Sequence, residues 1–192
     1  MATTPTSHSG FGPSALATPA NAVTIARVVA TPVLVGMIVR DGVTWPAFLF
    51  WFVLSCTDGV DGWLARRQGT TRSGAFLDPL ADKVVVLSAM VALVAIGAFW
   101  WLPVMLIAGR EIWIVAYRTS AGRRGISVPA RATAKVKTVV QDCAVGFALL
   151  PWTADRARIA STVLWVAVGL TLFTGAQYLL DGRRASQVSS AM

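Results

Sequence analysis

Residues 58–82 read DGVDGWLARRQGTTRSGAFLDPLAD, a stretch that brings four aspartates into an otherwise apolar part of the chain. Asp58 and Asp61 are three positions apart, and Asp78 and Asp82 are four positions apart. Residues at these spacings lie on one face of an α-helix. The stretch therefore predicts two consecutive helices, each carrying a pair of carboxylates on one face, joined by a short basic loop.

The rest of the chain has the composition of a membrane protein. Of its 192 residues, 55% are hydrophobic and 14% are charged, and its mean hydropathy is +0.63. A bilayer-spanning helix needs about 20 mostly apolar residues. Apolar runs of about this length lie at 22–40, 45–65, 74–98, 100–118, 134–151 and 159–180. We therefore expect an all-α integral membrane protein with six transmembrane helices.

Polar segments lie on both sides of these runs. Residues 1–20 are rich in Ala, Ser, Thr, Pro and Gly and contain no Lys, Arg, Asp or Glu. They lack the basic region of a cleaved secretory signal, so we expect a flexible N-terminal tail. Residues 21–182 are expected to form one six-helix membrane domain, and residues 183–192 a short C-terminal tail.

Basic residues are distributed unevenly between the expected loops. One side of the membrane has only Arg40, Arg156 and Arg158. The other side has eleven, namely Arg66, Arg67, Arg72, Arg118, Arg123, Arg124, Arg131, Lys135, Lys137, Arg183 and Arg184. The positive-inside rule places the second set in the cytoplasm, together with both termini. We therefore expect a multi-pass protein of the cell membrane, a bacterial inner or plasma membrane, whose carboxylate site faces the cytoplasm.

Four tryptophans fall near the expected outer ends of the helices, where an aromatic belt would place them: Trp45, Trp100, Trp101 and Trp152. The net charge of +8 lies on no visible soluble, polar domain, so we expect no nucleic-acid partner. Anionic membrane lipids or phosphorylated substrates are the expected partners.

The two cysteines, Cys56 and Cys143, both lie within apolar runs. They match no metal-ligand or disulfide spacing. We expect both to be buried apolar side chains.

The four aspartates need charge compensation. A carboxylate at bilayer depth costs at least about 2.5 kcal/mol, and mutual repulsion would protonate some of the four unless cations lie between them. A single intramembrane aspartate is compatible with a proton relay or a packing role, but four at these spacings are not. Oxygen-only ligation suits Mg²⁺ or Mn²⁺, which keep open positions for water and phosphate oxygens. The sequence predicts a two-metal site that handles a phosphate ester.

The same stretch resembles the signature of the CDP-alcohol phosphotransferases. That signature reads D-x-x-D-G-x-x-A-R, then a short gap, then G-x-x-x-D-x-x-x-D, and every fixed position matches between Asp58 and Asp82. The resemblance implies the six-helix fold of that family over nearly all the chain after the tail. It also implies a reaction in which an alcohol hydroxyl attacks the β-phosphorus of a CDP-linked lipid and releases CMP.

The resemblance assigns roles to individual residues. It implies two Mg²⁺ or Mn²⁺ ions held by Asp58, Asp61, Asp78 and Asp82, with Asp82 also acting as the general base. It implies nucleotide binding by Asn21, Thr24, Asp58, Asp61, Gly62, Ala65, Arg66 and Gly74, where Asn21 and Thr24 belong to an N-x-x-T-x-x-R segment that ends at Arg27. We expect Arg27 to face the protein interior, and the family resemblance suggests a homodimer.

Further segments narrow the choice of acceptor alcohol, because they are similar to segments of phosphatidylglycerophosphate synthases. They are DPLADK at 78–83, GREI at 109–112, and KVKT at 135–138 followed by Gln141. This subfamily joins CDP-diacylglycerol to sn-glycerol 3-phosphate. A phosphorylated acceptor requires a basic pocket, for which the candidates are Arg110, Arg118, Lys135 and Lys137. We expect Glu111 or the carboxylate cluster to hold Arg110, and Lys83 to snorkel or to pair with a carboxylate.

Three alternatives remain open. A phosphatidylinositol-phosphate synthase would use the same metal site and would also need a basic pocket. A cardiolipin synthase takes an uncharged hydroxyl, so a basic pocket argues against it. A divalent-cation transporter would place ionisable groups through the depth of the membrane, whereas the four aspartates lie near one end of their helices.

Overall fold

The computed structural model describes residues 19–68, 74–123 and 132–190. Side chains are described for 22–57, 80–116 and 136–177, apart from 154, 155 and 157. The elements in order are α1 (Pro19–Asp41), α2 (Trp45–Gln68), α3 (Gly74–Ala95), α4 (Trp101–Arg123), α5 (Ala132–Leu149), the 3₁₀-helix η1 (Pro151–Arg156) and α6 (Ala157–Ser190). No strand occurs in these ranges, so the expected all-α fold is confirmed for the described part of the chain.

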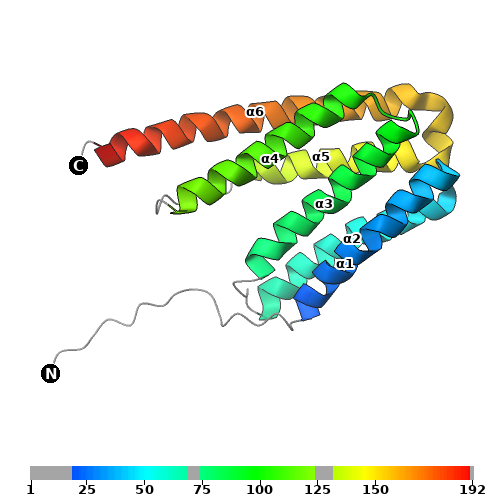
Figure 1. Cartoon of the computed structure of the whole chain (residues 1–192), viewed down its shortest axis with the longest axis horizontal. Helices are drawn as coiled ribbons and strands as arrows, with labels where there is room; N and C mark the ends of the chain where they lie inside the picture. Colours follow the sequence, from blue (N-terminus) through cyan, green and yellow to red (C-terminus); the bar gives the residue numbers. More distant parts are fainter. Residues whose placement is uncertain (1–18, 69–73, 124–131, 191–192) are drawn as a thin grey trace.

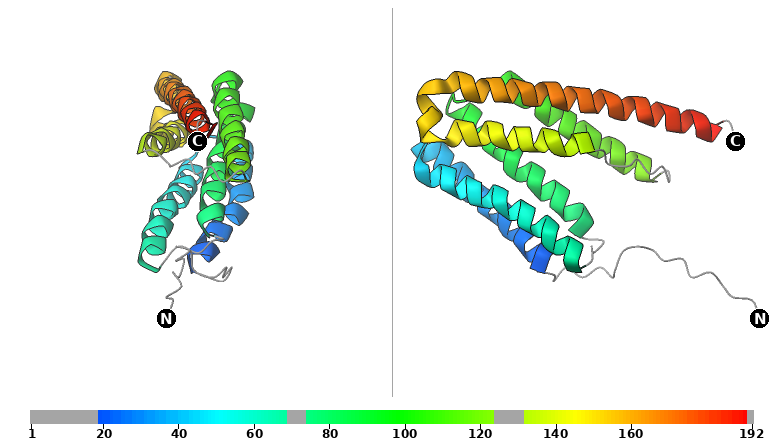
Figure 2. Two further views of the ribbon diagram at one scale, coloured as in Figure 1. Left: turned by 90° about the vertical axis from the view of Figure 1, so that its left-hand side faces the viewer. Right: turned by 180° about the vertical axis from the view of Figure 1, so that it is seen from behind.

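The helices alternate in direction (Figure 1). The α1–α2, α3–α4 and α5–α6 connections gather at one end, and the first residues of α1 and the last of α6 both lie away from that end (Figures 1 and 2). α1 packs against α2 and α3, while α6 packs against α4 and α5. α3 and α5 connect these two groups, because α3 contacts α4 and α5 and α5 also contacts α2.

Two glycines end helices at the shared end. Gly42 follows α1 with a φ of 72°, and Gly97 follows α3 with a φ of 76°. Glycine adopts this left-handed conformation at no steric cost and is the usual residue just past a helix C-terminus. The amide of Gly42 donates to the Ile38 carbonyl at 3.0 Å. These turns let α2 and α4 start within a few residues and run back along their predecessors.

The core lies between closely packed helices. Leu34 and Ile38 of α1 and Met90 and Leu93 of α3 are fully buried. At the α2–α5 contact, a Cβ on Gly146 would lie 2.9 Å from Cζ3 of the Trp51 ring. The absent side chain at position 146 lets the two helices approach closely, as small residues do between membrane helices.

The outer surface is strongly apolar. Val29 of α1 and Met105 and Ile112 of α4 are each more than 60% exposed. Soluble proteins rarely expose extensive apolar surface, whereas a lipid-facing surface requires it. Among the described residues, Ala22–Asp41 and Arg158–Gln177 are long and apolar enough to cross a membrane. Within the described residues, Trp45–Thr57 of α2 is a shorter apolar stretch.

The expected burial of the cysteines is wrong, because Cys56 of α2 and Cys143 of α5 are both exposed. The expectation treated an apolar neighbourhood as a sign of burial. In a helix that faces lipid, apolar residues cover the outside as well as the inside. Hydropathy therefore does not separate the two faces.

The helix limits differ from the apolar runs at several ends. α6 continues to Ser190, past the limit at 182 expected from hydropathy. α1 begins at Pro19, so most of the expected N-terminal tail, 1–18, lies outside the described residues. Backbone hydrogen bonds extend a helix irrespective of polarity, whereas an apolar run stops at the first cluster of polar side chains.

The four tryptophans singled out in the sequence lie at the shared end. Trp45 begins α2, Trp101 begins α4 and Trp152 lies in η1. The rings of Trp45 and Trp152 meet edge to face with centroids 5.3 Å apart, and Trp100 contacts Trp101 with centroids 6.4 Å apart. All four are exposed, from 40% for Trp45 to 79% for Trp152. This placement fits an interfacial aromatic belt.

Candidate active site

The four signature aspartates lie on two successive helices. Asp58 and Asp61 are on the second half of α2, and Asp78 and Asp82 are on the first half of α3. α2 and α3 run in opposite directions and meet near residues 68 and 74 (Figure 1). Both pairs therefore lie toward the same end of the bundle, opposite the tryptophans. The Asp82 side chain is half-buried, and the side chains of the other three aspartates lie outside the described part of the chain.

The expected nucleotide-binding positions lie around these pairs. Gly62, Ala65 and Arg66 continue α2 toward its C-terminus, and Gly74 is the first residue of α3. Their side-chain positions are outside the described residues, so their nucleotide contacts stay a prediction.

α1 brings further polar residues to this end of the bundle. It packs against both α2 and α3, and its first turns contain the N-x-x-T-x-x-R segment. Thr24 is 2% exposed and Arg27 is 3% exposed. The expectation that Arg27 faces the interior is confirmed. Asn21 lies on the same helix, with its side chain outside the described set.

A buried charge cluster lies beside the predicted base. Its centre is Glu111 of α4, the only glutamate in the chain, whose side chain is 3% exposed. Glu111 Oε2 accepts from Lys83 Nζ at 2.5 Å, and Oε1 accepts from Arg110 Nη1 at 3.1 Å. Oε1 also accepts a short hydrogen bond from Lys137 Nζ. One carboxylate thus joins cations from α3, α4 and α5.

Arg110 is also held from α6. Its Nη2 donates to Thr174 Oγ1 at 3.0 Å. Directly after Thr174, a Cβ on Gly175 would lie 3.3 Å from Nε and 3.5 Å from Cγ of Arg110. The guanidinium therefore lies between the Glu111 carboxylate and the backbone of α6, with 9% of the side chain exposed.

The polar network continues between α5 and α6. Gln141, one turn beyond Lys137, donates from Nε2 to Thr171 Oγ1 at 3.0 Å. Gln141 and Thr171 are both buried. A buried polar group is tolerated when it is hydrogen-bonded, so these contacts explain how polar side chains persist in the interior.

The structure brings together two of the four residues expected to bind the acceptor phosphate. Arg110 and Lys137 both contact Glu111, and Asp82, Lys83 and Arg110 all lie within electrostatic reach of Lys137. The expected pairings of Arg110 with Glu111 and of Lys83 with a carboxylate are confirmed. Arg118 lies on α4 and Lys135 on α5, with both side chains outside the described residues.

Sequence reasoning missed Thr171 and Thr174. Their signal is a weak one, because Thr171, Thr174 and Gln177 recur every three residues along an otherwise apolar run. Such a stripe predicts a polar face on the last helix. It does not predict which helix that face contacts.

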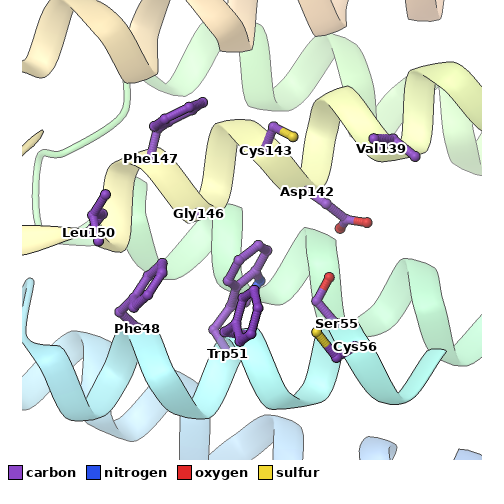
Figure 3. A pocket seen from close by; sticks show the side chains of 11 residues that line it. Phe48, Trp51, Ser55, Cys56, Val139, Asp142, Cys143, Gly146, Phe147 and Leu150 are labelled. Atoms are coloured by element: carbon purple, nitrogen blue, oxygen red, sulfur yellow. The ribbon is translucent and has the colours of Figure 1, made fainter. Parts of the chain in front are cut away.

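A separate cavity of about 440 Å³ lies between α2 and α5 (Figure 3). Most of its lining is apolar, including Phe48, Trp51 and Phe147. Ser55 of α2 and Asp142 of α5 add polar groups at one end and point toward each other (Figure 3). Asp142, which the sequence left without a role, is thus part of a cavity wall.

Comparison with known proteins identifies the class of protein that carries this site. Residues 17–173 match the family described as CDP-alcohol phosphatidyltransferase. The match covers most of the chain, including α1 to α5, and the chain therefore belongs to this family of transferase enzymes.

The relatives carry two names. The chain is 40% identical over 173 residues to the CDP-diacylglycerol–glycerol-3-phosphate 3-phosphatidyltransferase of Escherichia coli K12, covering 83% of this chain and 92% of that one. It is 38% identical over 169 residues to the protein of the same name from Shigella flexneri, with the same coverage. It is 35% identical over 183 residues to a probable phosphatidylglycerophosphate synthase of Mycobacterium tuberculosis H37Rv, covering 90% of this chain and 85% of that one.

Proposed function

We propose that the protein transfers the phosphatidyl group of CDP-diacylglycerol to the hydroxyl of sn-glycerol 3-phosphate, releasing CMP and forming phosphatidylglycerophosphate. Family membership supports the phosphatidyl transfer. The names of relatives that are 35–40% identical over most of the chain support the two substrates. The same family membership favours an enzyme over a divalent-cation transporter.

The observation that supports a phosphorylated acceptor is the gathering of three basic side chains next to Asp82. Lys83, Arg110 and Lys137 surround one carboxylate, Glu111. Buried charges are costly unless they are paired. A dianionic phosphate would pair with these cations and would hold its own hydroxyl near Asp82. The cluster favours a cardiolipin synthase less, because the acceptor of that enzyme, phosphatidylglycerol, offers an uncharged hydroxyl and a phosphodiester with a single negative charge.

A divalent metal fits the donor set on α2 and α3. Asp58, Asp61, Asp78 and Asp82 offer only oxygen atoms, and the backbone brings the two pairs to one end of the bundle. Hard, oxygen-only ligation is what Mg²⁺ and Mn²⁺ prefer. We propose that these four residues hold two such ions, which would stabilise the negative charge on the reacting phosphates.

Other residues of the chain bind the two substrates and accept the proton. Arg110 and Lys137 bind the acceptor phosphate, and Asp82 takes the proton of the acceptor hydroxyl as its oxygen bonds to the β-phosphorus. The bond between the β-phosphorus and the bridging oxygen breaks, and CMP leaves with that oxygen. Asn21, Thr24, Gly62, Ala65, Arg66 and Gly74 hold the nucleotide, where the small residues admit the cytidine and Arg66 faces its phosphates.

We further propose that all six helices cross the membrane, in a cell membrane such as the bacterial inner membrane. The tryptophan end would face outward and the aspartate end would face the cytoplasm. The supporting observations are the apolar exposed surface, the tryptophans at one end, and the basic residues concentrated toward the other end. The functional unit proposed from the family resemblance is a homodimer.

The test uses purified protein in detergent with CDP-diacylglycerol and Mg²⁺ or Mn²⁺. Glycerol 3-phosphate, inositol 1-phosphate and phosphatidylglycerol are supplied separately, and CMP release is measured. We expect release with glycerol 3-phosphate. Release only with inositol 1-phosphate would make the protein a phosphatidylinositol-phosphate synthase, and release only with phosphatidylglycerol a cardiolipin synthase. No release with any acceptor would refute the proposed activity.

A further inference from the structure

The last helix carries an unexplained contact with the basic pocket. α6 contributes none of the signature aspartates, yet Thr174 and Gly175 meet Arg110 of α4 directly. Both residues lie just beyond position 173, where the match to the family ends. The family match therefore assigns no role to this contact.

The geometry around Arg110 restrains its guanidinium from three sides. Glu111 accepts from Nη1 at 3.1 Å, and Thr174 accepts from Nη2 at 3.0 Å. Gly175 leaves room for the side chain to lie against the helix, since an added Cβ would lie 3.3 Å from Nε. A guanidinium is planar with donors in a fixed fork, so fixing two of its nitrogens fixes the direction in which its remaining donors point.

Thr174 is itself held in place. Its hydroxyl lies 2.8 Å from the Leu170 carbonyl and 3.1 Å from the Thr171 carbonyl, to which it can donate. A hydroxyl that donates to the helix backbone presents its lone pairs outward, toward Arg110. One turn earlier on the helix, Thr171 accepts from Gln141 of α5. The polar face of α6 thus connects to both helices that carry the pocket.

We propose that Thr174 and Gly175 are positioning residues that set the orientation of Arg110 for the acceptor phosphate, and so tune the affinity for the phosphorylated acceptor. This proposal rests on the proposed function, in which Arg110 binds that phosphate. Neither residue touches the reacting atoms. Their effect is expected on acceptor binding and not on the transfer step, nor on the binding of CDP-diacylglycerol.

The experiment measures initial rates of CMP release in the full-length protein while each substrate is varied in turn. Thr174→Val keeps the shape but removes the hydroxyl, and we expect it to raise KM for glycerol 3-phosphate about tenfold, the loss of one charge-assisted hydrogen bond. Gly175→Ala is expected to raise it about threefold, because Arg110 must shift by a few tenths of an ångström. Both variants should keep kcat and the KM for CDP-diacylglycerol. Thr174→Ser, which retains the hydroxyl, should restore the wild-type KM.

Matched controls lie on the same helix. Gly169→Ala places a methyl group in open space, and Thr162→Val removes an exposed hydroxyl that bonds only locally to the Arg158 carbonyl. Both should leave each kinetic constant unchanged. A double variant adds a further readout. Once Arg110 is replaced by lysine, Thr174 has no guanidinium to orient, so adding Thr174→Val should change the KM for glycerol 3-phosphate little further.

The outcomes separate the two claims. An active wild-type enzyme in which Thr174→Val leaves the KM for glycerol 3-phosphate unchanged overturns the positioning role alone. A rise in the KM values for both substrates together with a fall in kcat also overturns it, since that would indicate a general packing role. A wild-type protein that uses no phosphorylated acceptor overturns the proposed function first. If Thr174→Val does not fold, Gly175→Ala and the Thr174→Ser comparison carry the same test.

Discussion

Replacing Glu111 by glutamine tests whether the buried charge cluster holds the helices together. The carboxylate is 3% exposed, and it accepts from Lys83, Arg110 and Lys137. Glutamine has nearly the same volume, so the substitution leaves no cavity and keeps one acceptor oxygen. It removes the negative charge that all three cations contact, and one of them, Lys137, is 5% exposed.

The magnitude follows from the burial. Removing one partner of a buried ion pair costs about 3–5 kcal/mol, because the other charge is left uncompensated. For a protein of this size, each kcal/mol lowers Tm by about 2–4 °C. We therefore expect Glu111→Gln to lower Tm by about 6–20 °C, measured by far-ultraviolet circular dichroism in detergent micelles. The control is Asp41→Asn, which removes an exposed carboxylate at the end of α1 and should leave Tm unchanged.

A double variant identifies the cause of the loss. Adding Lys137→Gln to Glu111→Gln removes one of the stranded cations, so the double variant should be more stable than the sum of the two single effects predicts. The coupling should be at least about 1 kcal/mol, as expected for residues in one network. A Tm for Glu111→Gln within about 2 °C of wild type, less than one kcal/mol of stability, would refute this reasoning. A double variant whose loss of stability equals the sum of the two single losses would also contradict it.

Four further outcomes are expected. Gly146→Ala should destabilise the protein by about 1–3 kcal/mol, because its Cβ would lie 2.9 Å from the Trp51 ring; Gly169→Ala, in open space, is the control, and equal Tm values would contradict the contact. Asp82→Asn should slow CMP release at least about 100-fold while equilibrium binding of CDP-diacylglycerol persists, and a near-normal rate would exclude Asp82 as the base. Lys137→Gln should raise the KM for glycerol 3-phosphate at least about tenfold through a lost charge-assisted bond, with little change for CDP-diacylglycerol. Chelation with EDTA should stop CMP release until Mg²⁺ or Mn²⁺ is added, and activity in metal-free protein would refute the two-metal proposal.

The helices could be predicted from the sequence because each one coincides with a long apolar run bounded by polar residues. Glycines at 42 and 97 mark two of the reversals, and both adopt the positive φ that favours glycine. The end of α6 could not be predicted in the same way. Polar residues after 180 end the apolar run, but the backbone hydrogen bonds of the helix continue to Ser190.

The candidate site was partly predictable for a different reason. The spacing of the aspartates predicts that each pair lies on one face of its helix. The position of Arg110 next to Glu111 suggests a local ion pair. The contact between Arg110 and Thr174 joins residues 64 positions apart in sequence, and no local pattern encodes such a contact. The exposed cysteines show the same limit, because an apolar run does not distinguish a face that packs against protein from one that lines an open cavity.

The cavity between α2 and α5 is lined by two cysteines that can be labelled. Cys56 and Cys143 are both exposed, and they lie on opposite walls of that cavity (Figure 3). They are the only cysteines in the chain, so spin labels attached to the wild-type protein would go to these two sites without any engineering. The spectrum of such a doubly labelled sample would register any separation of α2 from α5 during turnover. The unmodified sequence can thus serve as a sensor of how this pair of helices moves.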